Sequence, residues 1–260
     1  MSSSTQVNND NAACCSIPPV QSDYKPVGTY KPYAGFQKVY MTGPEKSDLA
    51  LVAVYDIFGF YPQTQQGADL LAQQLNATLV MPDFFEPDAP WPNDRFPPQS
   101  DDEKASLQAF FGPGGAAHPP KSVDRLLDVA RQLKADGAKK VGAFGFCWGG
   151  KVNILAGSVV DTPLDAVAAV HPAMLSAEDV ETLSVPLGLY PSKDESTEEY
   201  TKMLEIVSKK PFAAKNDHKH YTTMFHGFAA ARADLDNAEN KKQFEDLYNT
   251  LLKYFQKSLA

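Results

Sequence analysis

The sequence has few cysteines, no basic cluster and no long hydrophobic run, and each of these absences narrows the class of protein. Three cysteines in 260 residues, two of them adjacent at Cys14 and Cys15, do not make a disulfide framework, so we expect a cytoplasmic protein. A formal net charge of -8 without a basic run argues against a nucleic-acid or membrane partner. No apolar stretch approaches the length of a membrane span, and residues 1–11 lack the layout of a secretory signal.

The N-terminal residues differ in composition from the rest of the chain. Residues 1–26 are rich in Ser, Asn and Pro and show no hydrophobic periodicity, which predicts a flexible arm. Cys14 and Cys15 lie in this arm without a further cysteine or histidine nearby, so they do not predict a zinc site. Residues 27–260 are long enough for a single large α/β domain.

Apolar runs and amphipathic stretches alternate along the predicted domain. The expected strands cover residues 36–42, 49–55, 77–81, 141–146, 165–170, 185–190 and 220–225. The expected helices cover residues 63–75, 101–111, 122–135, 198–208 and 240–255, with one more after the 141–146 strand. Continuous apolar runs are typical of strands buried on both faces, so we predict a doubly wound, mostly parallel sheet flanked by helices. The Pro-, Trp- and Phe-rich stretch 84–100 is irregular and suited to form the wall of a pocket.

One short motif carries most of the functional information. Gly145-Phe146-Cys147-Trp148-Gly149 matches the G-x-S-x-G nucleophile elbow, with Cys in place of Ser. In this turn the central residue is strained and its side chain projects from the carboxyl end of a strand, while the glycines allow strand and helix to cross closely. A sulfur at a helix N-terminus is favoured as thiolate. The alternative is that Cys147 is a small buried hydrophobe in an ordinary turn.

Two further residues complete a predicted catalytic triad. In the hydrolase arrangement the nucleophile is followed along the chain by the acid and then by the base. Cys147, Asp194 and His226 have this order, and each follows a predicted strand. The backbone N–H groups of Trp148 and Ile57 are the expected oxyanion-hole donors. Asp194 is also suited to cap a helix, which is the alternative for that residue.

Other histidines compete for a functional role. His171 also follows a predicted strand, but as the base it would precede Asp194 and break the triad order. We therefore expect it to line the pocket or to satisfy a buried hydrogen bond, and we assign the base to His226. His218 and His220 form an H-x-H pair, but no third ligand stands nearby, so we predict no metal site.

Several motifs together resemble the dienelactone hydrolase family. They are Gly-Phe-Cys-Trp-Gly-Gly at 145–150, Asp-Ile-Phe-Gly at 56–59, Pro-Asp-Phe-Phe at 82–85, His-Gly-Phe at 226–228, and Asp194. The resemblance extends from about residue 36 to the C-terminus, and Cys-Cys-Ser-Ile-Pro-Pro at 14–19 is similar to fungal members. It implies a single-domain α/β-hydrolase fold, a Cys-His-Asp triad and no cofactor. Bacterial members open the lactone ring of dienelactones, and related members cleave other esters and lactones.

The expected substrate pocket departs from the bacterial pattern. We expect it to be lined by Asp56, Phe58, Phe84, Phe85, Trp91, His171 and Phe228. Asp56 stands where the family usually has a Glu that contacts the resting thiol and is displaced by substrate, so this gating is expected to be altered or lost. The bacterial enzymes hold a substrate carboxylate with two arginines. Here Glu86 occupies the first position and Arg232 is displaced from the second, which argues against an anionic dienelactone as substrate. The aromatic residues of the 84–100 stretch favour a bulkier apolar or aromatic ester.

These observations predict a hydrolase that cleaves a lactone or an activated ester through a thioester on Cys147. An enol leaving group suits a thiol nucleophile, because a simple alkoxide would expel the thiolate again. One alternative is a redox-sensing or ligand-binding protein that uses the same thiol without turnover. Another is a broad-specificity carboxylesterase. The expected partner is a small-molecule substrate, and the chain is expected to be a monomer or a homodimer.

Overall fold

The computed structural model describes residues 23–260, so Cys14, Cys15 and most of the predicted arm lie outside the described residues. The described chain folds around one sheet of eight strands. The strands are β1 (Thr29–Tyr33), β2 (Phe36–Thr42), β3 (Leu49–Val54), β4 (Thr78–Pro82), β5 (Lys140–Phe146), β6 (Ala166–Val170), β7 (Leu187–Tyr190) and β8 (Asp217–His218). Their order in the sheet is β1-β2-β4-β3-β5-β6-β7-β8. Strand β2 pairs antiparallel with both β1 and β4, and all pairs from β4 to β8 are parallel. The predicted mostly parallel sheet is confirmed.

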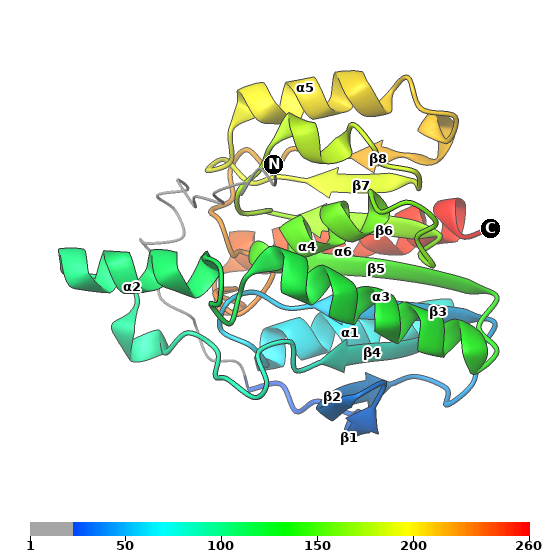
Figure 1. Cartoon of the computed structure of the whole chain (residues 1–260), viewed down its shortest axis with the longest axis horizontal. Helices are drawn as coiled ribbons and strands as arrows, with labels where there is room; N and C mark the ends of the chain where they lie inside the picture. Colours follow the sequence, from blue (N-terminus) through cyan, green and yellow to red (C-terminus); the bar gives the residue numbers. More distant parts are fainter. Residues whose placement is uncertain (1–22) are drawn as a thin grey trace.

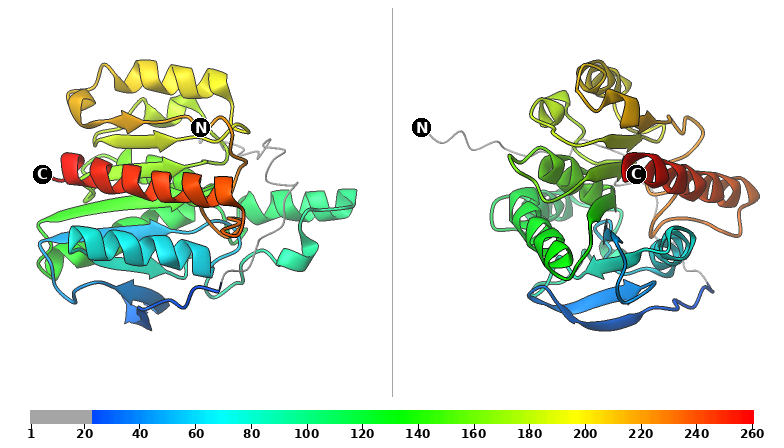
Figure 2. Two further views of the ribbon diagram at one scale, coloured as in Figure 1. Left: turned by 180° about the vertical axis from the view of Figure 1, so that it is seen from behind. Right: turned by 90° about the vertical axis from the view of Figure 1, so that its right-hand side faces the viewer.

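Helices cover both faces of this sheet. They are α1 (Pro62–Leu75), α2 (Asp101–Phe111), α3 (Pro119–Ala135), α4 (Trp148–Gly157), α5 (Thr197–Val207) and α6 (Ala238–Ser258), with short 3₁₀ turns η2 (Asn93–Arg95), η3 (Ala177–Val180) and η4 (Ala213–Lys215). Helices α1 and α6 lie on one face, and α3 and α4 lie on the other (Figures 1 and 2). Helix α2 projects beyond the end of the sheet (Figure 1). None of the helices in residues 23–260 has the length and apolarity needed to cross a membrane.

The central strands form where apolar runs predict them, because both of their faces are covered. All residues of β4 and β6 are buried, as are all but the first residues of β3 and β5. Parallel strands β3, β5, β6 and β7 are neighbours in the sheet, so the segments that follow them meet at one edge. That edge carries Asp56, Cys147, His171 and the loop after β7.

The two outer strands differ from prediction. Strand β1 was not expected because its Thr-Tyr-Lys-Pro-Tyr sequence is polar, and it forms as an exposed edge strand, where proline is tolerated. The expected strand at 220–225 is wrong: β8 is only Asp217–His218, and Tyr221 makes a single bridge to Ser192. The chain turns after Tyr221, where the Met224 N–H donates to the Tyr221 carbonyl at 2.9 Å, and it then bends toward the loop after β7.

Candidate active site

The turn between β5 and α4 has the backbone geometry of a nucleophile elbow. Cys147 lies between them with φ 54° and ψ -118°, a conformation that a non-glycine residue rarely adopts. A Cβ atom on Gly145 would lie 2.4 Å from the Gly149 carbonyl oxygen, and one on Gly149 would lie 2.3 Å from the Val54 carbonyl oxygen. Both glycines are therefore required for the close crossing of strand and helix that the motif predicts.

Neighbouring backbone fixes the cysteine at the start of α4. The Cys147 N–H donates to the Val170 carbonyl at 3.1 Å, and the Cys147 carbonyl accepts from the Ala173 N–H at 3.0 Å. The last residue of β6 and the segment after it thus hold the backbone of Cys147 through its N–H and its carbonyl. Cys147 is 4% exposed and occupies the N-cap position of α4, where the helix dipole favours a thiolate.

The ring of His226 is hydrogen-bonded to Glu195, and the expectation that Asp194 orients this ring is wrong. His226 Nδ1 lies 2.6 Å from Glu195 Oε1, and 0% and 1% of the two side chains are exposed. The second carboxylate oxygen of Glu195 accepts a hydrogen bond from the backbone N–H of Ser192. Glu195 therefore occupies the position beside the His226 ring that the sequence analysis assigned to Asp194.

Asp194 holds the backbone of the same histidine instead. Its Oδ2 accepts a hydrogen bond from the His226 N–H at 2.8 Å, and its own N–H donates to Ser192 Oγ at 3.3 Å. The Lys193 N–H donates to the Met224 carbonyl at 3.0 Å, which adds a second link between the two loops. The sequence offered no means of separating the two acids, because both follow β7 and both precede His226.

The two expected oxyanion-hole donors lie on neighbouring strand ends. Ile57 follows β3, and Trp148 begins α4 directly after β5, which pairs with β3. Within residues 23–260 neither backbone N–H donates a hydrogen bond to another residue, whereas the Ile57 carbonyl accepts one from the Trp91 N–H at 2.8 Å. Both N–H groups are thus available to a carbonyl oxygen of a bound substrate.

Asp56 is a buried carboxylate that connects two loops of the site. Its Oδ1 accepts a hydrogen bond from the Phe58 N–H at 3.0 Å, and its Oδ2 accepts one from the Ala231 N–H at 3.1 Å. Burial raises its pKa to about 6, and the two N–H donors and the charges of Arg232 and His226 counteract part of this rise. The gating of the thiol that the family resemblance suggested for this position stays a prediction.

His171 lies directly beside the ring of His226. The ring centroids are 5.0 Å apart, and His171 also contacts Phe146, at 5.8 Å, and Phe228, at 5.7 Å. The residue is 0% exposed and has a positive φ of 35°. Neither ring nitrogen has a hydrogen-bond partner within the described chain, so the expected buried hydrogen bond is absent there. Burial, together with His226 and Arg232, holds the pKa of His171 well below its ordinary value, so the ring is neutral.

Four of the expected pocket residues are core residues. Phe84, Phe85, His171 and Phe228 are 0–1% exposed, and the first two rings pack against Trp148, at centroid distances of 6.3 and 5.0 Å. Phe84 and Phe85 thereby support the elbow helix from within, and the expectation that these four residues line the pocket stays a prediction. Their aromatic character does not predict this burial, because aromatic rings are equally suited to pack in a core and to line a pocket.

The remaining expected pocket residues keep a small exposed area. Phe58 and Trp91 are each 5% exposed, and Phe58 packs edge-on against Phe96 at 5.2 Å. The Arg232 guanidinium lies 5.4 Å from the Phe96 ring and is 3% exposed. A Cβ atom on Gly227 would lie 2.4 Å from Arg232 Nε, so this arginine packs against the backbone next to His226.

Glu86 stands at the position of the first family arginine and has a structural role. Its carboxylate accepts the Gln37 N–H at 2.7 Å and the Lys38 N–H at 3.2 Å, and it pairs with Arg125 at 3.6 Å. His218 and His220 contact other partners. His218 Nδ1 lies 2.8 Å from the Tyr200 hydroxyl, and His220 Nε2 lies 3.0 Å from the Ser192 carbonyl.

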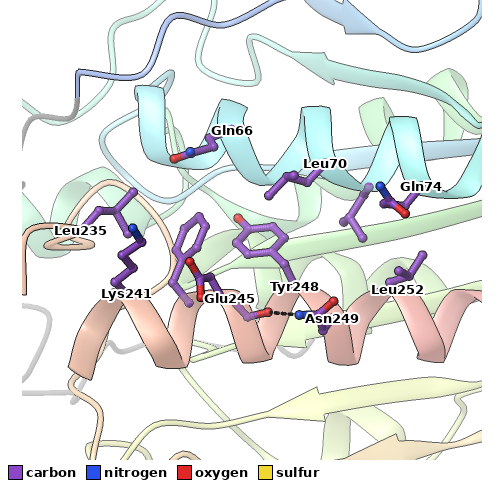
Figure 3. Close-up of a pocket in the computed structure, with 11 residues that line it drawn as sticks. Gln66, Leu70, Gln74, Leu235, Lys241, Glu245, Tyr248, Asn249 and Leu252 are labelled. Atoms are coloured by element: carbon purple, nitrogen blue, oxygen red, sulfur yellow. Dashed lines mark hydrogen bonds between the residues drawn. The ribbon is translucent and has the colours of Figure 1, made fainter. Parts of the chain in front are cut away.

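A groove of about 560 Å³ lies away from these residues, between α1 and α6 (Figure 3). Its lining includes Leu70, Leu71, Leu235, Phe244, Tyr248 and Leu252, and none of the predicted site residues. Tyr248 points from α6 toward α1 in this view, and its hydroxyl donates to the Ala229 carbonyl at 3.1 Å. Tyr248 thereby links α6 to the loop that carries His226.

The fold and the elbow define an α/β-hydrolase. A structure of dienelactone hydrolase from Anabaena variabilis has the same fold, with a TM-score of 0.61 and 13% identity over 94% of this chain and 100% of that chain. The chain belongs to the dienelactone hydrolase family, whose model matches residues 37–259. An uncharacterized AIM2 family protein of Schizosaccharomyces pombe is 31% identical over 219 residues, covering 84% of this chain and 86% of the relative. A carboxymethylenebutenolidase homolog of Mus musculus is 27% identical over 224 residues, covering 85% and 87%.

Proposed function

We propose that the protein hydrolyses a lactone or an activated ester, with Cys147 as nucleophile, His226 as acid and base, and Glu195 as the carboxylate that orients the imidazole. The observation that carries this proposal is a strained cysteine at a helix N-terminus on the same sheet edge as a buried histidine–carboxylate pair. A cysteine that only fills the core needs neither a positive φ nor such a pair nearby.

In the first half of the reaction, the Cys147 thiolate attacks the substrate carbonyl carbon. A C–S bond forms, and the carbonyl π electrons move to the oxygen, which the N–H groups of Trp148 and Ile57 stabilise. The tetrahedral intermediate collapses to a thioester as the bond to the leaving oxygen breaks. His226 gives its proton to that oxygen, so a lactone opens or an alcohol departs.

In the second half, water replaces the sulfur. His226 takes a proton from the water, the new C–O bond forms, and the tetrahedral intermediate then expels the Cys147 thiolate. Glu195 keeps the ring in the orientation that serves both steps and stabilises the imidazolium that forms transiently. A leaving group that is stabilised as an enol limits return of the thioester to substrate, which favours enol lactones and aryl esters as substrates.

A panel of lactones and aryl esters, each with and without a carboxylate, tests the proposal. We expect multiple turnovers by the wild type, and Cys147→Ala should lose activity at least about 1000-fold while its thermal unfolding stays unchanged. Cys147→Ala with near wild-type turnover would reject the assignment. A single stoichiometric burst with p-nitrophenyl acetate would favour the binding or redox alternative.

The panel also decides the charge of the substrate. The rings of Phe58 and Trp91, each 5% exposed, suit a neutral aromatic group, as the sequence suggests. Arg232, which packs beside Gly227, favours the opposite, a substrate with a carboxylate. We expect neutral aryl esters to be cleaved, and cleavage confined to anionic lactones would contradict this. Inactivation by iodoacetamide, without inactivation by serine-directed phosphonates, should separate this enzyme from a serine-type carboxylesterase.

A further inference from the structure

We infer that Asp56 is a positioning residue that clamps the oxyanion loop to the loop that carries His226; this inference rests on the proposed function. The two loops come from opposite ends of the chain, and Asp56 is the side chain that spans them through hydrogen bonds to both. It acts through the Ile57 N–H on one side and through His226 on the other. Its role is to hold the two catalytic groups in register.

The two carboxylate oxygens have separate tasks. Oδ1 accepts the Phe58 N–H at 3.0 Å, which closes a local turn around Ile57 and fixes the direction of its N–H group. Oδ2 accepts the Ala231 N–H at 3.1 Å, across a sequence separation of 175 residues. An ordinary aspartate turn accounts for the first bond only. The second bond is not part of that turn: it satisfies the buried Ala231 N–H and fixes the segment five residues after His226.

The charge on Asp56 faces the base of the proposed reaction. The charged and titratable groups that act on it are Arg232 and His226, and it acts in turn on Tyr248 of α6. Asp56 is 2% exposed, and burial disfavours its ionised form. A negative charge near His226 favours the imidazolium that forms during catalysis. An asparagine at this position would accept one of the two N–H groups without the free-energy cost of burying a charge. The carboxylate accepts both N–H groups at that cost, and we take this as an indication of a functional role.

The test compares Asp56→Asn with the wild type as a function of pH. The amide resembles the protonated acid, because each has one acceptor oxygen and one donor group. At about pH 7.5 we expect kcat of Asp56→Asn to be about 10- to 100-fold below the wild type, with KM changed less than about threefold. The ratio of wild-type to variant kcat should fall toward one as the pH drops below about 6, and it should be about 2–10 at about pH 5, where most of the wild-type carboxyl is protonated. A merely structural role would leave the ratio constant with pH.

Asp83→Asn provides a matched control. Asp83 also follows a strand and closes a local turn, at 3.4 Å from the Phe85 N–H, and it accepts the Tyr55 hydroxyl at 2.7 Å. Because it does not bond to the loop of His226, we expect kcat within about threefold of the wild type at both pH values. A kcat ratio for Asp56→Asn that is near one throughout, or that is independent of pH, would overturn the inference.

A second measurement needs no substrate and separates this inference from the proposed function. We expect iodoacetamide to alkylate Cys147 about tenfold more slowly in Asp56→Asn than in the wild type at about pH 7.5, because a displaced His226 loop supports less thiolate. Mass spectrometry of the peptide that contains Cys147 distinguishes it from Cys14 and Cys15. Equal alkylation rates in the two proteins would overturn the clamp even if no ester is hydrolysed. Slower alkylation of Asp56→Asn would support the clamp even if neither protein hydrolyses an ester.

Discussion

Glu195→Gln should reduce kcat by about 1000-fold, whereas Asp194→Asn should change it by less than about threefold. The buried Glu195 carboxylate lies 2.6 Å from His226 Nδ1, so its charge centre is about 4 Å from that of the imidazolium. At an effective dielectric constant of about 20, this attraction is worth about 4 kcal/mol, and its loss from the transition state corresponds to about 1000-fold in rate. Glutamine keeps the shape of the side chain and removes the charge.

Asp194 provides the matched comparison, because its carboxylate accepts the backbone N–H of His226 and its own backbone N–H donates to Ser192 Oγ. Asparagine retains an acceptor for the His226 N–H, so the loop should keep its position. The assay is steady-state kcat with the best substrate of the panel, accompanied by thermal unfolding to show that both variants fold. A large loss in Asp194→Asn together with near wild-type kcat in Glu195→Gln would refute the assignment of Glu195 and restore Asp194 as the acid.

Two further predictions concern stability. Burial raises the pKa of Asp56 from 3.8 to about 6, so the folded protein binds this proton more tightly than the unfolded chain does. The free energy of unfolding of the wild type, relative to that of Asp56→Asn, should therefore fall by about 2 kcal/mol as the pH rises from about 4.5 to about 7.5. Urea unfolding at the two pH values measures this difference. A difference that does not change with pH would contradict the buried charge. His171→Phe keeps a ring between Phe146 and His226 and removes two buried nitrogens without partners in the described chain, so the free energy of unfolding should rise by about 1–3 kcal/mol. A decrease would show that these nitrogens have partners in solution.

The sequence was sufficient for the central sheet and the elbow because both depend on local patterns. A strand buried on both faces must be apolar throughout, as Leu49–Val54 and Ala166–Val170 are, so its pattern reports its environment directly. The edge strands carry no such signal. Thr29–Tyr33 is exposed and contains a proline, and Asp217–His218 is too short for an alternating pattern to exist. Tertiary pairing alone determines these two strands.

The aromatic stretch after β4 shows a different limit of the sequence. Its composition indicated that large rings form the wall of a pocket. Trp91 and Phe96 contact the loop after β3, since the Trp91 N–H donates to the Ile57 carbonyl and the Phe96 ring packs on Phe58. Whether a ring faces the substrate or the core depends on where the chain bends. Phe84 and Phe85 lie two and three residues after β4 and pack onto Trp148, so they are buried. No spacing rule distinguishes the two groups, because the segment lacks regular periodicity.

The exchange between Asp194 and Glu195 follows from the difference in reach between the two side chains. The loop after β7 must hold the His226 loop in two ways: by its backbone N–H and by its ring. Asp194 makes the backbone bond, whereas the longer Glu195 extends past Ser192, whose N–H holds the second carboxylate oxygen, to the imidazole. Chain order constrains only which segment supplies the acid, and two adjacent acids satisfy it equally. The assignment therefore depends on side-chain length and direction, which appear only once β7 and the His226 loop are placed together.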